Sequence, residues 1–213
     1  YDHYAPAVVP ALTSRSEYLT AYTPYQAEIS QGTLRYIFEF QSMIATLTGM
    51  DCANASMYDG ATAAAEAMMM AIAATRKKTR VLLSSTLLPQ VREVVHTYAK
   101  YHGVELSEIA SADGQTDIDD VRRLLEAGDV AGVLVPSVNR FGIVEDLPGF
   151  TEAAHAQKAL LMVYADPSAL AVVRTPGEWG ADVACGDAQT LGIPLGFGGP
   201  YVGFLACSKE HVR

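Results

Sequence analysis

The sequence is poor in cysteine and in positive charge. Its three cysteines, Cys52, Cys185 and Cys207, are widely spaced. No pair has zinc-ligand spacing, and a disulfide framework is implausible, so we expect a reducing, cytoplasmic setting. Lysine and arginine number 15 against 24 aspartates and glutamates, which gives a formal charge of −9. This balance excludes a protein that grips a nucleic-acid backbone through a basic stripe.

Long apolar runs and paired histidines are also lacking. No stretch is long enough to cross a bilayer, so we expect no membrane partner. The five histidines are scattered without metal-pair spacing, and no metal site is expected. No nucleophile elbow, phosphate-binding Walker loop or dinucleotide fingerprint occurs. Half of the residues are hydrophobic and 18% are charged, which indicates a globular chain with one sizeable core.

The chain divides into an arm and one domain. Residues 1–30 contain three prolines and one expected short helix, and we interpret them as an N-terminal arm. Residues 31–213 form the domain. Because the sequence begins at Tyr1 without an initiator methionine, we expect it to be part of a longer protein.

Two helices are predicted first, over residues 31–48 with Ser30 as cap and over residues 61–75. Strands and helices then alternate. Strands are expected at residues 81–83, 104–106, 132–135, 159–164, 182–185 and 201–206. Helices are expected from Pro89, after a capping box of Thr116 with Asp119, and over residues 147–158. This order predicts an α/β fold with a mostly parallel sheet flanked by helices. No helix separates the last two strands, so they are expected to pair antiparallel.

The segment over residues 22–32 has more hydrogen-bonding capacity than a connector needs. Tyr22, Thr23, Tyr25 and Gln26 surround Pro24, which holds the backbone extended. One interpretation is a strap whose polar tips reach a ligand pocket, across a subunit interface. The other is an ordered arm packed on its own domain.

The segment over residues 54–62 precedes the alanine-rich helix. Gly60 and its small neighbours expose backbone N–H groups at a helix start, where an anion such as phosphate is favoured. Asp59, however, places a carboxylate where the phosphate would sit. A helix capped by Asp59 or Thr62, without a ligand, is therefore the strong alternative.

A glycine-rich loop over residues 187–201 follows Asp166, which ends another strand. That layout is typical of a pyridoxal-phosphate site, where an aspartate holds the pyridinium nitrogen and a lysine forms the Schiff base. The loop position expected to carry the lysine is Gln189, and an amide cannot form an imine. The lysines present are expected at exposed helix ends and surfaces: Lys77, Lys78, Lys100, Lys158 and Lys209.

Three motifs carry a resemblance to a known family. Residues 22–32, 53–63 and 189–200 look like the glycine cleavage P-protein, most of all subunit 1 of its two-subunit bacterial form. Residues 141–147 also fit, and the resemblance runs from Tyr1 to Arg213.

The resemblance implies the large domain of fold type I of the pyridoxal-phosphate-dependent transferases. It implies that a second subunit holds the cofactor lysine, and that the enzyme decarboxylates glycine and passes the aminomethyl group to the lipoyl H-protein. No catalytic residue is then expected in this chain. Remnants of a cofactor site are expected at Tyr58, Asp59, Gly60, Asp166 and Gln189, and Tyr22, Thr23, Tyr25 and Gln26 are candidates for lending to the partner's pocket.

Two alternatives compete with this interpretation. One is a stand-alone pyridoxal-phosphate decarboxylase or aminotransferase, against which Gln189 counts strongly. The other is a purely structural or regulatory subunit whose arm never touches a ligand. A strap and a connector have similar composition, so the sequence does not separate these two roles for the arm.

Overall fold

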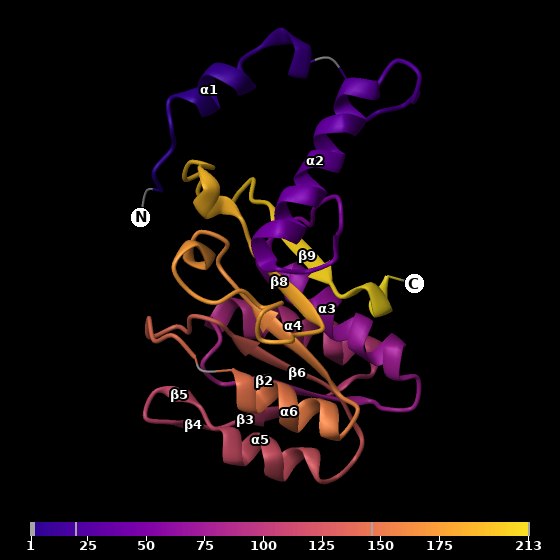
Figure 1. Ribbon diagram of the computed structural model, residues 1–213, viewed down its shortest axis with the longest axis vertical. Helices are drawn as coiled ribbons and strands as arrows, with labels where there is room; N and C mark the ends of the chain where they lie inside the picture. Colours follow the sequence, from indigo (N-terminus) through magenta and orange to yellow (C-terminus); the bar gives the residue numbers. More distant parts are fainter. Residues whose placement is uncertain (1–2, 20, 146, 213) are drawn as a thin grey trace.

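A seven-stranded sheet forms the centre of the part of the chain that the structure describes (Figure 1). The structure is a computed structural model, and it describes residues 3–19, 21–145 and 147–212. The strands of the sheet are β1 (Cys52–Ala53), β2 (Arg80–Ser84), β3 (Glu105–Ile109), β6 (Val130–Pro136), β7 (Leu160–Tyr164), β8 (Val183–Asp187) and β9 (Gly203–Cys207).

The strand order is β1-β9-β8-β7-β6-β2-β3. Strands β3, β2, β6, β7 and β8 run parallel, as predicted. Strand β9 pairs antiparallel with β8, which confirms the expected antiparallel end of the sheet. The short edge strand β1, antiparallel to β9, was not predicted. Every residue of the interior strand β6 is buried, because helices cover both faces of the sheet.

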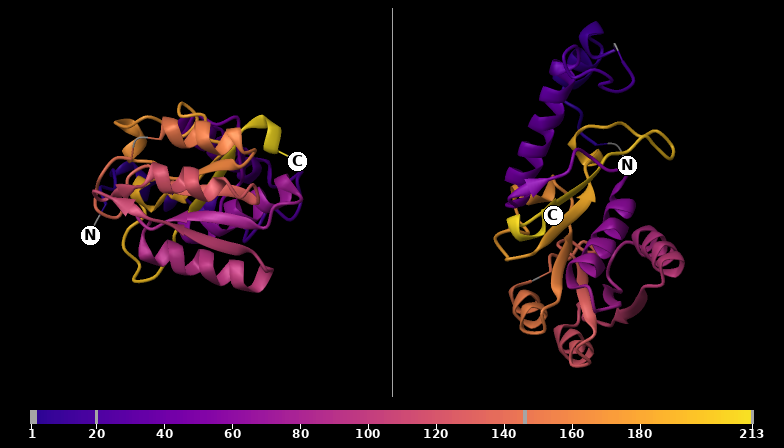
Figure 2. Two further views of the ribbon diagram at one scale, coloured as in Figure 1. Left: turned by 90° about the horizontal axis from the view of Figure 1, so that it is seen from below. Right: turned by 90° about the vertical axis from the view of Figure 1, so that its right-hand side faces the viewer.

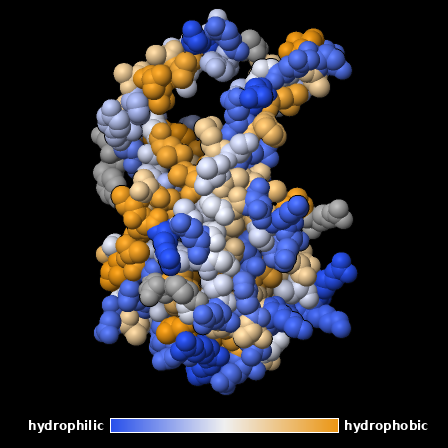
Figure 3. All heavy atoms as spheres, viewed as in Figure 1, coloured by the Kyte–Doolittle hydropathy of each residue, from blue (hydrophilic) through white to orange (hydrophobic). Residues whose placement is uncertain are grey.

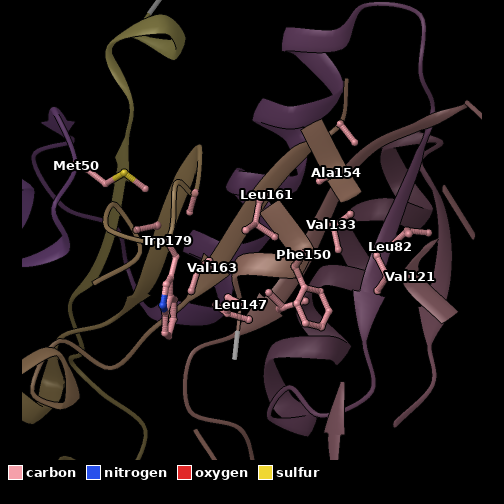
Figure 4. Close-up of a cluster of buried hydrophobic side chains, with 14 of the residues drawn as sticks. Met50, Leu82, Val121, Val133, Leu147, Phe150, Ala154, Leu161, Val163 and Trp179 are labelled. Atoms are coloured by element: carbon pink, nitrogen blue, oxygen red, sulfur yellow. The ribbon is translucent and has the colours of Figure 1, made fainter. Parts of the chain in front are cut away.

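Helices pack on the two faces as separate layers. The longer helices are α2 (Gln31–Thr48), α3 (Gly60–Thr75), α4 (Pro89–His102), α5 (Ile118–Leu125) and α6 (Pro148–Ala156). Figure 2 (left) shows α5 and α6 on one side of the sheet and α4 on the other. Helices α3 and α4 bury one apolar cluster against the sheet. A second cluster, on the opposite face, contains Leu161, Phe150 and Trp179 (Figure 4).

The described residues from Val8 to the start of α2 form an arch that stands away from the sheet (Figure 1). They contain the short helix α1 (Val8–Thr13) and a 3-10 turn, η1 (Ser16–Tyr18), and α2 descends from the arch to the sheet. Several hydrophobic residues of this arch are exposed on the surface at the top of Figure 3. The large exposed apolar side chains of the arch and α2 are Tyr4, Val8, Leu12, Tyr18, Leu19, Tyr22, Tyr25, Ile29, Leu34, Tyr36, Phe38 and Met43.

One predicted helix cap was wrong, and a second was right in position but makes no side-chain hydrogen bond. Asp117, not Thr116, is the N-cap of α5, and its carboxylate accepts hydrogen bonds from the N–H groups of Asp119 and Asp120. Ser30 does stand at the N-cap of α2, but its side chain makes no capping hydrogen bond. A carboxylate one residue closer to the helix reaches the free N–H groups better than the threonine hydroxyl does.

Thr116 instead belongs to a buried polar cluster. It lies in a small hairpin of β4 (Ser111–Ala112) and β5 (Gln115–Thr116). Its N–H and the hydroxyl of Thr86 donate to the buried carboxylate of Glu145, at 2.9 and 2.8 Å. The amide of Asn139 also donates to Glu145, at 2.9 Å. These donors satisfy the Glu145 carboxylate, which forms no ion pair with the residues that the structure describes, and they fix the hairpin to the segment after β6.

Candidate functional site

A pocket of about 480 Å³ opens at the carboxyl ends of β7 and β8, beside the first turns of α3 and α4. This is the edge of an α/β sheet where ligands usually bind. The residues that line it are His3, Asp59, Ala61, Leu88, Gln90, Val91, Val94, Tyr164, Ala165, Asp166, Asp187, Gln189, Thr190, Gly198 and Tyr201. The pocket thus brings together Asp59, Asp166 and Gln189, three of the residues singled out from the sequence.

Two carboxylates fill the N-terminus of α3. Asp59 caps the helix, accepting a hydrogen bond from the Thr62 N–H at 2.8 Å, while the Thr62 hydroxyl accepts one from the Asp59 N–H. The Gly60 N–H donates to Oδ2 of Asp187 at 3.0 Å. A Cβ on Gly60 would lie 2.6 Å from the Asp187 nitrogen, so only glycine allows this close approach. Two of the N–H groups at this helix start, those of Gly60 and Thr62, therefore already have carboxylate partners.

Asp166 is likewise held by its own chain. Its Oδ1 accepts hydrogen bonds from the N–H and the hydroxyl of Ser168, at 2.8 and 2.7 Å. The hydroxyl of Thr190 donates to the same oxygen at 2.7 Å. These contacts tie the loop after β7 to the loop after β8 and orient the carboxylate at the pocket wall.

Gln189 lies on the pocket wall between these groups. Its N–H donates to Oδ1 of Asp187 at 2.8 Å. Its side-chain nitrogen Nε2 is buried and makes no hydrogen bond with the described residues. No lysine is among the described residues that line the pocket.

The lysines lie elsewhere, and four of them are exposed as predicted. Lys78 departs from that prediction, because it is half-buried and donates to the carbonyl oxygens of Gln157 and Lys158. Burial lowers the pKa of Lys78, and the neighbouring charge of Lys158 lowers it further, while Asp129 opposes the shift. Lys78 lines a different pocket and is not among the residues that line the pocket at Gln189.

The pKa of Tyr164 shows the effect of burial and of the acidic groups around the pocket. Burial raises the pKa of its hydroxyl far above the ordinary value, and the neighbouring Cys185, Asp187, Asp166 and Asp59 add to the shift. The hydroxyl therefore stays protonated. An environment that opposes one more negative charge on Tyr164 also opposes a phosphate.

Pyridoxal phosphate does not fit this pocket. The cofactor needs an amine for its aldehyde and free N–H groups for its phosphate. Gln189 supplies no amine, and Asp59 and Asp187 occupy the helix end. The wall of this pocket is acidic, with Asp59, Asp166 and Asp187, and none of the described residues that line it has the amine needed to bind the cofactor covalently.

The residues of the expected strap lie apart from this pocket. Tyr22, Thr23, Tyr25 and Gln26 are all exposed, and none of them lines it. Tyr22 is 92% exposed. Tyr58, expected beside the cofactor site, is 87% exposed and does not line the pocket either. Among the described residues, the segment over residues 22–26 and the pocket do not form one site, although His3 at the start of the arm does line the pocket.

Sequence reasoning missed several residues of the pocket. Asp187, Thr190 and Tyr164 were not singled out, although the position of Asp187 at the end of a buried strand was a usable signal. His3 carried no such signal. It reaches the pocket because the segment around Ala5 lies against the glycine-rich loop near Gly192.

The sequence predicted neither a metal site nor a stretch long enough to cross a membrane. Among the described residues, no group of three or more histidine, cysteine, aspartate or glutamate side chains is placed to hold a metal ion. The helices over the described ranges include none with the length and apolar character needed to cross a bilayer.

Comparison with known proteins gives consistent matches over the chain. The family model described as glycine cleavage system P-protein matches residues 1–213. The chain is 55% identical to the probable glycine dehydrogenase (decarboxylating) subunit 1 of Desulforamulus reducens, across 100% of this chain and 47% of that protein. It is 53% identical to the protein of the same name from Moorella thermoacetica, across 100% of this chain and 48% of that protein.

A solved structure agrees with these matches. It is a crystal structure of glycine decarboxylase (P-protein) of the glycine cleavage system in inhibitor-bound form, with a TM-score of 0.93 and 47% identity. The match covers 99% of this chain and 47% of that one. The expected fold of the pyridoxal-phosphate-dependent transferases is thereby confirmed. The chain spans about half the length of the curated relatives it matches.

Proposed function

The chain belongs to the glycine cleavage system P-protein family, and from this premise we propose that it is part of the subunit of glycine dehydrogenase (decarboxylating) that does not bind pyridoxal phosphate. In this proposal the cofactor lies on subunit 2, and the lipoyl H-protein is a further partner of the complex. The complex works in the cytoplasm. Residues 31–213 supply the large cofactor-type domain, and residues 1–30 supply the arm.

The observation that carries the proposal is the filled N-terminus of α3. A missing lysine alone would leave a pocket able to hold the cofactor by its phosphate. Here Gly60 and Thr62 already donate to Asp187 and Asp59, at 3.0 and 2.8 Å. Both the amine and the phosphate site are therefore lost, which also counts against a stand-alone decarboxylase or aminotransferase.

The arm is the part of the chain proposed to serve the partner's active site. Tyr22, Thr23, Tyr25 and Gln26 are exposed, and none of their side chains makes a hydrogen bond with the described residues. Bare aromatic and amide groups of this kind are typical of surfaces that contact another protein. We expect them to order substrate or cofactor on the partner, without themselves moving a proton.

The first experiment tests the pocket. The full-length protein that contains this chain is incubated with pyridoxal phosphate, reduced with borohydride and mapped by mass spectrometry. We expect no labelled lysine at this pocket, while subunit 2 treated in parallel gives one labelled lysine. One specifically labelled lysine beside Gln189, or carbon dioxide released from glycine by this protein alone, would overturn the proposal.

The second experiment tests the arm in the reconstituted complex. Tyr22→Ala and Gln26→Ala are expected to lower the rate of glycine decarboxylation by about tenfold or more, because each removes a positioned contact. The matched control is Tyr101→Ala, since Tyr101 on α4 is 76% exposed and lies outside the arm. An unchanged rate in a fully assembled complex would favour the purely structural or regulatory role.

A further inference from the structure

Two of the three cysteines face each other across the edge of the sheet. In the antiparallel pair of β1 and β9, Cys52 stands directly opposite Cys207. Both side chains are half-buried, and all three cysteines are free thiols. Cys185 on β8 is fully buried and pairs with Leu205, so it does not stand opposite either of them.

The hydrogen bonds around this pair fix its geometry. The Asn54 N–H donates to the Leu205 carbonyl at 2.9 Å, two residues along the same pair of strands. On the other side, the Ser208 N–H donates to Asp182 on the β8 side at 3.0 Å. Because such bonds alternate along an antiparallel strand, Cys52 and Cys207 form a hydrogen-bonded pair, whose Cα atoms lie about 5.5 Å apart.

The distance between the Cα atoms of Cys52 and Cys207 is compatible with a disulfide, but the bond between the two side chains would be strained. Disulfides span Cα distances of roughly 4.4–6.8 Å. Opposite residues of a strand pair project their side chains from the same face, with Cβ atoms about 4.5–5.5 Å apart, whereas a disulfide needs roughly 3.5–4.5 Å. Small movements of the two-residue strand β1 can close this gap. A strained disulfide is also more easily reduced than a relaxed one.

The environment makes oxidation slow. Burial raises the pKa of the Cys207 thiol, and the neighbouring Cys52 and Asp51 add to that shift. The thiolate that attacks an oxidant is therefore scarce at neutral pH. Reduced thiols are then the resting state in a reducing compartment, and oxidation needs sustained exposure to an oxidant.

We propose that Cys52 and Cys207 form a reversible disulfide that clips the edge strand β1 to β9. The oxidant is a low-molecular-weight disulfide. One protein thiolate attacks one of its sulfur atoms and releases a small thiol. The second protein thiolate attacks the resulting mixed disulfide and releases the other small thiol. The two cysteines lose two electrons and two protons, and the oxidant is reduced to two thiols.

The clip would act on the base of the arm. Strand β1 follows α2 and leads, through residues 54–59, to the cap of α3. Strand β9 follows the glycine-rich loop. A covalent link between the two strands fixes the position of α2, and so of the arm above it, relative to the pocket wall.

The test uses the full-length protein, purified in the reduced state and exposed to excess oxidised glutathione under native conditions. We expect peptide mapping without reductant to show Cys52 linked to Cys207, with the loss of two free thiols, and dithiothreitol to restore both. Cys52→Ser and Cys207→Ser should each abolish the link. Cys185→Ala, the matched control, should leave it intact.

Three results would overturn the proposal. They are separate glutathione adducts on Cys52 and Cys207 without a link between them, a complete absence of reaction over many hours, and a link that involves Cys185 instead. If Cys207→Ser fails to fold, the loss of the link in Cys52→Ser is used as the test by itself. This variant is expected to fold because Cys52 lies on a short edge strand.

Discussion

The pocket and the arm have opposite relations to their own chain. At the pocket, polar groups that could bind a ligand are already bonded to one another: Asp59 to Thr62, and Asp187 to Gly60. On the arm, the side chains of Tyr22 and Gln26 are exposed and make no hydrogen bond with the residues that the structure describes. Polar groups in the pocket are thus satisfied by their own chain, while the polar groups of residues 22–26 lie exposed on a segment outside the sheet.

The N-termini of helices α3 and α2 also differ in whether their polar groups are bonded within the chain. Asp59 caps α3 with a reciprocal capping box, and the helix begins inside the packed pocket. Ser30 stands at the equivalent place before α2 without a capping hydrogen bond, and the first turn of α2 is largely exposed. The two helix starts therefore offer matched pairs of substitutions.

The largest contrast is expected from glycine to alanine in the first turn of each helix. Gly60→Ala should destabilise the protein by about 1–3 kcal/mol, because the new Cβ meets packed backbone beside Asp187. Gly32→Ala should stabilise it by about 0.5–1 kcal/mol, since nothing lies within 4 Å of that position. Urea unfolding measures both, and equal effects at the two sites would contradict the comparison.

A smaller contrast is expected between the two N-caps. Asp59→Ala removes a capping carboxylate and should cost about 1 kcal/mol of unfolding free energy. Ser30→Ala removes no capping bond and should change it by less than about 0.5 kcal/mol. Thermal and urea unfolding of both variants give the difference. A Ser30→Ala variant as unstable as Asp59→Ala would show that the two starts are not distinct.

The smallest effect on stability is expected on the arm itself. Tyr22→Ala should shift the unfolding free energy of the isolated protein by less than about 0.5 kcal/mol, because the ring is almost wholly exposed. Its effect should appear only in the assembled complex, as a lower rate. A destabilisation above 1 kcal/mol in the protein alone would mean that the arm packs on its own domain, as a connector does.

Local patterns predicted the fold well. Apolar periodicity and the spacing of glycine and proline predicted the order of the longer strands and helices between residues 31 and 207, with bounds that differ from the structure by a few residues, but not the two-residue strands β1, β4 and β5. The lack of a lysine at position 189 was also visible, since it depends on residue type alone. The cap at Asp59 followed from its place directly before an alanine-rich helix.

Features that depend on long-range contact escaped prediction. Thr116 was assigned to a cap because a threonine three residues before an aspartate fits that motif, yet it bonds to Glu145, far along the chain. Edge strand β1 is two residues long and carries no periodicity. Residues 1, 2, 20, 146 and 213, including Asp146 of the family-like segment 141–147, lie outside the described residues.

The sequence by itself determined that position 189 carries an amide instead of a lysine, and its patterns predicted a mostly parallel sheet with an antiparallel end. Only the tertiary structure decided that Asp187 reaches Gly60 and that Cys52 stands opposite Cys207. The physical reason is that hydrophobic periodicity specifies which face of an element is buried, a local property. Which residues meet across the sheet depends on strand order and register, and both are set by packing over the whole domain.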